Sequence, residues 1–137
     1  MKRASLVIGP ESSGTRLWTR VLRACGCAGD GGHEQRWDTR PLETNLIVWR
    51  HSMPHGAEWF CVADWIQPLL TKGWRCAVYV KVRDWYANAC SQVHRSHAKS
   101  LNEAQMRIQR AYESIFMGLA ETSVPFAIVS YELVCRA

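Results

Sequence analysis

The sequence of 137 residues has no apolar run long enough to cross a bilayer. Its longest runs, such as 4–9 and 45–49, are far shorter than the roughly 20 residues of a membrane-spanning helix. The run behind the basic start ends at Gly9, which is too short for a signal peptide. Low-complexity segments and repeats of solenoid period are also missing. These absences predict one globular domain over residues 1–137, in the cytoplasm and without a membrane partner.

The six cysteines do not follow the spacings of zinc fingers or zinc ribbons. Cys25 and Cys27, with His33 nearby, could suggest a metal site, but a fourth ligand at a sensible spacing is missing. Cys90, His94 and His97 share helical spacing and could imitate a metal cluster, although a polar helix face is the more common cause of such a pattern. We therefore expect reduced thiols, several of them buried, and no metal ion.

Acidic residues are the scarcer charge, with 12 Asp and Glu against 17 Lys and Arg, which gives a net charge of +5. No basic run is dense enough to predict a specific nucleic-acid partner. The positive charge is mostly arginine, whose planar fork suits phosphate and sulfate. Scattered arginines that only solvate the surface would give the same composition.

Short β-branched runs alternate with longer amphipathic stretches. The pattern predicts strands at 5–8, 45–49, 76–82 and 126–129. It predicts helices at 15–24, 57–70 and 85–98, and a long helix that begins behind the capping-box pair Ser100 and Glu103. Such alternation favours an α/β fold in three layers, α/β/α, with a parallel sheet. Ligands of such sheets bind beyond the carboxyl ends of the strands.

The segment behind the first strand is Gly9-Pro-Glu-Ser-Ser-Gly14-Thr-Arg16. A small, glycine- and serine-rich turn before a helix directs backbone N–H groups at one point, where the helix dipole adds positive charge. The turn fits the first six positions of a Walker A loop. However, Thr15 replaces the Walker lysine and Arg16 replaces the magnesium-binding hydroxyl, so an ATPase or GTPase is not expected. An ordinary βα turn is the simplest alternative.

Ser12-Ser13-Gly14-Thr15-Arg16 also resembles the 5′-phosphosulfate loop of P-loop sulfotransferases, a family that needs no metal. By this resemblance the five residues bind the 5′-phosphosulfate of the donor, 3′-phosphoadenosine-5′-phosphosulfate (PAPS). The family's loop lysine aligns with Ser12. Arg16, Arg50 and Lys81 are the candidates to supply the missing charge, and a chain without it would bind donor but not turn over.

Two further segments are similar to the same family. Arg83 follows the third predicted strand and Ser91 comes eight positions later, the order and spacing with which sulfotransferases bind the 3′-phosphate of the donor. Ile128-Val-Ser-Tyr-Glu-Leu133 resembles the strand and Tyr-Glu motif near the end of family members. The chain is short for the family, and the C-terminal segment that usually closes over the nucleotide is expected to be absent unless the sequence is a fragment or a partner supplies that segment.

Sulfuryl transfer needs a base that takes the proton of the acceptor. Many sulfotransferases have Lys-x-His-x-Pro behind the second strand, and Arg50-His51-Ser-Met-Pro54 stands at this place, with Ser52 at the aligned base position. His51 is the first candidate, although a shift of one residue reverses a side chain within a strand. Glu34 is the second candidate, because another branch of the family uses a glutamate soon after the first helix. His55, His94 and His97 are lesser candidates.

The leading hypothesis is therefore a sulfotransferase-like enzyme that moves a sulfuryl group from PAPS to a hydroxyl or amine and releases 3′,5′-adenosine bisphosphate. His51 or Glu34 would act as base, and Arg50 would assist. The acceptor would be a small molecule or a glycan. The alternatives are a divergent P-loop nucleotide kinase or NTPase, and a non-catalytic nucleotide- or anion-binding module.

Overall fold

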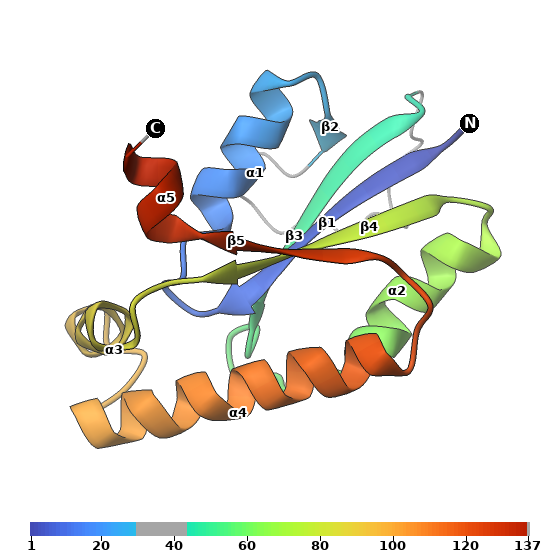
Figure 1. Ribbon diagram of the computed structural model, residues 1–137. Coiled ribbons are helices and arrows are strands. Elements are labelled where there is room, and N and C mark those ends of the chain that lie inside the picture. Colours follow the sequence, from blue (N-terminus) through green and yellow to red (C-terminus); the bar gives the residue numbers. More distant parts are fainter. Residues whose placement is uncertain (30–43, 137) are drawn as a thin grey trace.

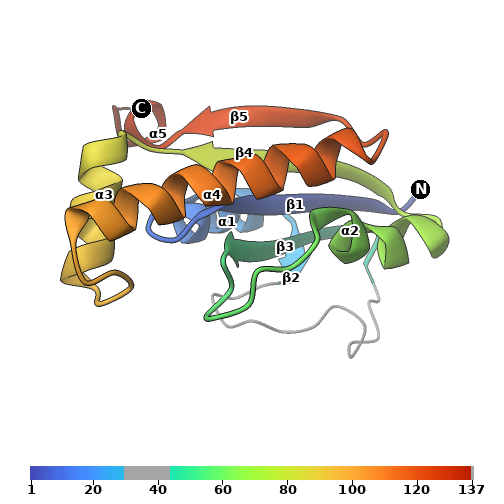
Figure 2. The same ribbon diagram turned by 90° about the horizontal axis from the view of Figure 1, so that it is seen from below.

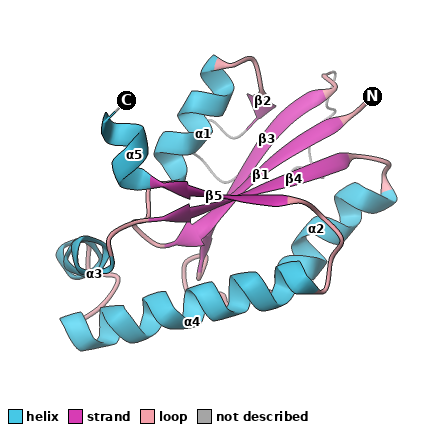
Figure 3. Cartoon of the chain, viewed as in Figure 1, coloured by secondary structure: helices cyan, strands magenta, loops and turns pink. Residues whose placement is uncertain are grey.

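The computed structural model describes residues 1–29 and 44–136. Within them the chain forms one five-stranded parallel sheet with the strand order β2-β3-β1-β4-β5 (Figures 1 and 3). The strands are β1 (Arg3–Pro10), β2 (Ala28–Gly29), β3 (Leu46–Met53), β4 (Arg75–Val82) and β5 (Phe126–Ser130). The predicted α/β class and parallel sheet are confirmed.

Strand β1 lies at the centre of the sheet, between β3 and β4. It pairs with β3 along its whole length, from Arg3 opposite Leu46 to Pro10 opposite Met53. On its other side it pairs with β4 up to Ile8 opposite Val80. Because all strands are parallel, the segments that follow β1, β3 and β4 meet at the same edge of the sheet.

Helices cover both faces of the sheet, as expected for three layers. α1 (Thr15–Ala24) and the short α5 (Tyr131–Arg136) lie on one face, and α2 (Val62–Thr71) and α4 (Leu101–Ala120) lie on the other (Figures 1 and 2). α3 (Trp85–His94) packs against α4 near the carboxyl edge of the sheet. No helix among the described residues is both long and apolar enough to cross a membrane.

The described core has a large cluster on one face of β1, a small cluster on the other face, and a third small cluster between α3 and α4. Leu6 and Ile8 belong to the large cluster under α2 and α4, whereas Val7 belongs to a small cluster with Val48 and Trp18 under α1. Both faces of the strand are therefore buried, which explains why its sequence is an unbroken apolar run and not an alternation.

The helix boundaries differ from prediction at two points. The helix predicted from residue 57 begins at Val62, because residues 55–58 form a tight turn closed by two backbone hydrogen bonds between His55 and Glu58. The helix predicted to reach residue 98 ends at His94, and Ser96 has a left-handed φ of 60°. β2 and α5 were not predicted, since two and six residues carry little periodicity.

The predicted cap of Ser100 on α4 is confirmed, whereas the Glu103 side chain bonds to the N–H of the residue before the cap. The Ser100 hydroxyl accepts a hydrogen bond from the Glu103 N–H at 3.2 Å, and the Glu103 carboxylate accepts one from the Lys99 N–H at 2.8 Å. These bonds fix the start of α4 and the approach of the chain that connects it to α3.

Candidate functional site

The loop between β1 and α1 has the geometry of an anion site. The Ser13 N–H donates to the Pro10 carbonyl at 3.1 Å, and Ser12 and Gly14 both adopt left-handed conformations, with φ of 63° and 92°. Gly14 caps α1 without a side-chain hydrogen bond to the helix. The N–H groups of the first turn, which have no acceptor within the helix, therefore remain available to a ligand.

The end of β4 and the start of α5 hold this loop in place. Arg83 donates from Nη1 to the Ser12 carbonyl at 3.0 Å, and its guanidinium carbon lies 4.5 Å from the centre of the Tyr131 ring. A Cβ atom at Gly14 would collide with Cδ2 of Tyr131, so the loop can approach α5 this closely only with glycine at that position.

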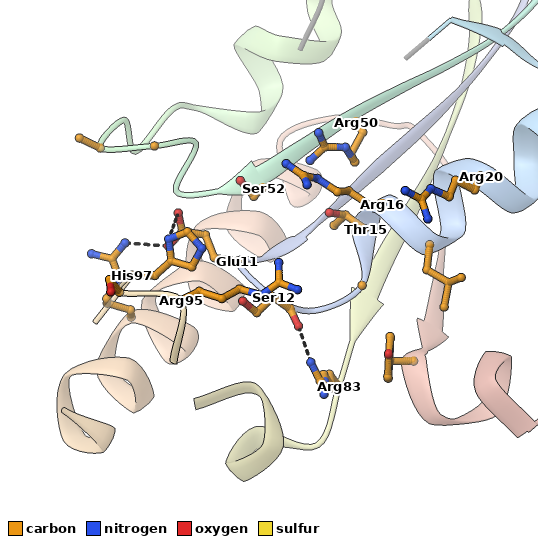
Figure 4. Close-up of a pocket in the computed structure, with 17 residues that line it drawn as sticks. Glu11, Ser12, Thr15, Arg16, Arg20, Arg50, Ser52, Arg83, Arg95 and His97 are labelled. Atoms are coloured by element: carbon orange, nitrogen blue, oxygen red, sulfur yellow. Dashed lines mark hydrogen bonds and ion pairs between the residues drawn. The ribbon is translucent and has the colours of Figure 1, made fainter. Parts of the chain in front are cut away.

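A cavity of about 760 Å³ opens over the loop (Figure 4). Its wall is rich in arginines from five parts of the fold: Arg16, Arg20, Arg50, Arg83, Arg95 and Arg107. Among the described residues that line it, Glu11 is the one carboxylate. The cavity therefore favours a ligand with several negative charges.

Glu11 is buried, and its carboxylate and its backbone carbonyl both contact other side chains. Arg107 donates from Nη2 to Oε2 of Glu11 at 2.9 Å, and Nδ1 of His97 lies 3.6 Å from Oε1 (Figure 4). The buried Gln92 side chain donates to the Glu11 backbone carbonyl at 3.0 Å. Arg107 therefore balances the charge of the one carboxylate that lines the described wall.

Most residues predicted for donor binding lie at this cavity. The wall includes Ser12, Gly14, Thr15, Arg16 and Arg83, together with Arg50 from the predicted catalytic set.

Two members of the predicted set lie elsewhere. Ser13 is fully buried in the turn, and Ser91 is half-buried on α3 and is not among the described residues of the wall. Ser91 is therefore not brought together with Arg83 at the cavity surface. Glu34 lies outside the described residues.

His51 is placed on the other face of the sheet. β3 continues two residues beyond it to Met53, so alternation still applies at this point. Arg50 and Ser52 line the cavity, whereas the His51 ring lies 5.2 Å from Phe60 and 5.0 Å from Trp65, between ring centres. This geometry separates the first candidate base from the cavity.

Lys81, a candidate for the missing loop charge, does not line the cavity. Its side chain is fully buried, and Nζ lies 5.4 Å from the centre of the Trp18 ring of α1. Desolvation by burial lowers the pKa of Lys81, and the nearby Cys135 and Glu132 oppose that shift. Of the three candidates, Arg16 and Arg50 are those that reach the wall.

Several residues of the wall were not predicted for the site. Glu11 lies inside the predicted loop, and Tyr131 inside the predicted Tyr-Glu motif, so both could have been proposed from their position. Arg95 and Arg107 carry no local signal, because the packing of α3 against α4 brings them to the cavity.

Comparison with known proteins gives no relative: no family model matches the chain, and no curated protein or solved structure matches it significantly. The described residues also contain no group of three or more His, Cys, Asp or Glu side chains placed to hold a metal ion. All six cysteines, which lie within the described ranges, are unpaired.

Proposed function

We propose that the chain is a sulfotransferase-like enzyme that transfers a sulfuryl group from PAPS to a hydroxyl or amine acceptor. The observation that carries the proposal is the cavity at the carboxyl edge of the sheet, which has an anion loop at its base and six arginines in its wall. PAPS is a suitable ligand because it carries negative groups at two separate points, the 5′-phosphosulfate and the 3′-phosphate.

Two buried polar atoms support the fit. Ser12 Oγ and Arg83 Nε, both from residues of the wall, have no hydrogen-bond partner among the described residues. Buried polar groups in proteins are almost always paired, so these two donors suit the oxygens of a ligand. We assign the 5′-phosphosulfate to the loop from Ser12 to Arg16, and the 3′-phosphate to Arg83.

The chain's own groups would orient and neutralise the donor. The N–H groups at the start of α1 would bind the transferring end, and Arg16 and Arg50 would balance charge on the leaving phosphate. When bound, PAPS supplies the sulfuryl group itself. A divergent P-loop kinase or NTPase is disfavoured because Thr15 stands where the lysine is needed.

Calorimetric titration tests the proposal. We expect 3′,5′-adenosine bisphosphate to bind without magnesium, and Arg83→Ala to weaken binding about 10- to 100-fold, since hydrogen bonds to charged groups contribute about 1.5–3 kcal/mol. Arg23→Ala is the matched control, because Arg23 is exposed in the last turn of α1 and does not line the cavity. Circular dichroism would show that both variants are folded.

Each alternative gives a different result. Binding of ATP with magnesium but not of the bisphosphate would replace the proposal with a divergent kinase or NTPase. Tight binding of the bisphosphate, with no sulfuryl transfer to any acceptor, would leave a non-catalytic nucleotide-binding module. Equal weakening by Arg83→Ala and Arg23→Ala would remove Arg83 from the site.

A further inference from the structure

The proposed transfer requires a base in the cavity, and the structure offers a pair that is neither His51 nor Glu34. We propose that His97 is the general base and that Glu11 orients it, an inference that rests on the proposed function. Both residues line the cavity beside the anion loop (Figure 4). They come from different segments, the loop after β1 and the connection between α3 and α4.

The Glu11 carboxylate is buried and fixed in position, as a group that orients a histidine must be. Its side chain is 8% exposed, and Arg107 fixes Oε2 at 2.9 Å. The other oxygen, Oε1, faces His97 Nδ1 at 3.6 Å. This separation is slightly long for a hydrogen bond, as is common for catalytic contacts without substrate.

A hydrogen bond of its backbone fixes the position of His97. Ser96, with its left-handed φ of 60°, ends the α3 segment and turns the chain. The His97 N–H then donates to the Gln92 carbonyl at 2.8 Å. Gln92 also donates its side-chain amide to the Glu11 carbonyl at 3.0 Å, so one buried residue connects both members of the pair.

The contact defines which nitrogen reacts. With Nδ1 directed at the carboxylate, Nε2 of His97 is the nitrogen left for the cavity, where the ring is 39% exposed. The same division of roles, a carboxylate on one imidazole nitrogen and the reacting group on the other, operates in hydrolase triads. The charged groups around the ring are Glu11, Arg107 from α4 and the neighbouring Arg95.

Nε2 of His97 takes the proton of the acceptor hydroxyl or amine as the acceptor atom bonds to sulfur. The bond between sulfur and the bridging oxygen breaks, and its electron pair leaves with the phosphate oxygen of 3′,5′-adenosine bisphosphate. Glu11 stabilises the imidazolium that forms, and Arg107 keeps Glu11 in place.

The first test measures release of sulfate from PAPS with water as the acceptor, because water serves without knowledge of the natural acceptor. We expect His97→Gln to lower the single-turnover rate at least 100-fold, as for loss of a general base, with bisphosphate affinity unchanged within about threefold. His94→Gln is the control, since His94 is exposed in the last turn of α3 and does not line the cavity.

The pH dependence separates a catalytic from a structural role. The wild-type rate should fall on the acid side, because a protonated base cannot accept the proton of the acceptor, and this fall should disappear in His97→Gln. In Glu11→Gln the fall should persist, with a smaller loss of rate than in His97→Gln, because the base is still present but less well oriented. Added imidazole should restore part of the rate to His97→Ala.

The outcomes distinguish the two proposals. If the wild type fails to bind the bisphosphate, the proposed function is wrong. If it binds the bisphosphate and releases sulfate, but His97→Gln releases it at the same rate, the pair is not the base while the proposed function stands. If the wild type binds the bisphosphate but transfers no sulfuryl group from PAPS to water or to any other acceptor, both the transfer activity and the catalytic pair are overturned.

Discussion

The two faces of β3 at its carboxyl end differ sharply, although their residues alternate along one short segment. Arg50 and Ser52 face the arginine-rich cavity. Trp49 and His51 face the other way, with their ring centres 5.2 Å apart, beside the ring of Trp65. The difference shows that the parity of a position within its strand decides whether a polar side chain can serve the cavity. Residue type alone does not decide it.

Substitutions on the two faces should therefore change different properties, with bisphosphate binding affected on the cavity face and stability on the other. Arg50→Met should weaken bisphosphate binding about 10- to 100-fold, because it removes a buried charge from the cavity wall. His51→Leu should leave the affinity within about twofold and change only stability. Titration calorimetry measures the first effect, and chemical denaturation the second. A loss of sulfate release in His51→Leu would return His51 to the active site.

Two glycines, one at each end of α1, lie in very different surroundings. Gly14 and Gly26 both have left-handed φ, 92° and 98°, but a Cβ at Gly26 would meet no atom within 4 Å whereas one at Gly14 would meet Tyr131. Gly14→Ala should therefore cost about 1–3 kcal/mol more than Gly26→Ala and weaken anion binding as well. Denaturation and calorimetry measure the two effects. Equal costs would show that only backbone strain matters at Gly14, and Tyr131→Ala should relieve the collision.

Lys81 is a second buried cation, and it lies outside the cavity wall. Burial lowers the pKa of Lys81 below its ordinary value of 10.5. Between the lowered value and 10.5 the unfolded chain binds more protons than the folded one, so stability should rise with pH in that interval. Lys81→Met should raise stability at pH 7 and reduce this rise, without changing bisphosphate affinity. Denaturation at pH 7–10 measures both, and a stability loss at pH 7 would contradict the prediction.

The sheet could be predicted from the sequence because parallel strands buried on both faces leave continuous apolar runs. The runs around Leu6, Val48 and Val78 all became strands. The start of α2 was predicted too early, because Ala57, Trp59 and Phe60 continue the helical pattern although the chain there is still in and behind a turn. The spacing of apolar side chains does not show a turn that is held by hydrogen bonds between backbone groups.

Sequence reasoning predicted only those parts of the candidate site that lie directly behind a predicted strand. The loop from Ser12 to Arg16 and the strand-end Arg83 follow from their place behind strands, and they reach the cavity. The face of His51 depends on where β3 ends, which the sequence pattern placed four residues too early, at 49 instead of Met53. His97 was a lesser candidate base in the sequence analysis. Its place at the cavity depends on the chain turn behind α3 and on its backbone bond to Gln92, and the sequence pattern does not show either.

The wall of the cavity runs from Glu11 to Tyr131, almost the full length of the sequence. Its parts meet through parallel pairing of distant strands, a topology of high contact order that forms slowly. During synthesis, a chain whose Tyr131 has not yet left the ribosome therefore lacks the Tyr131 ring, which packs beside Gly14 and lies under the guanidinium of Arg83. Once the chain is whole, any anion that occupies the cavity would bind the native state alone and add to its stability in proportion to the logarithm of its concentration. The ligand would then stabilise only chains that have been synthesised at least as far as Tyr131.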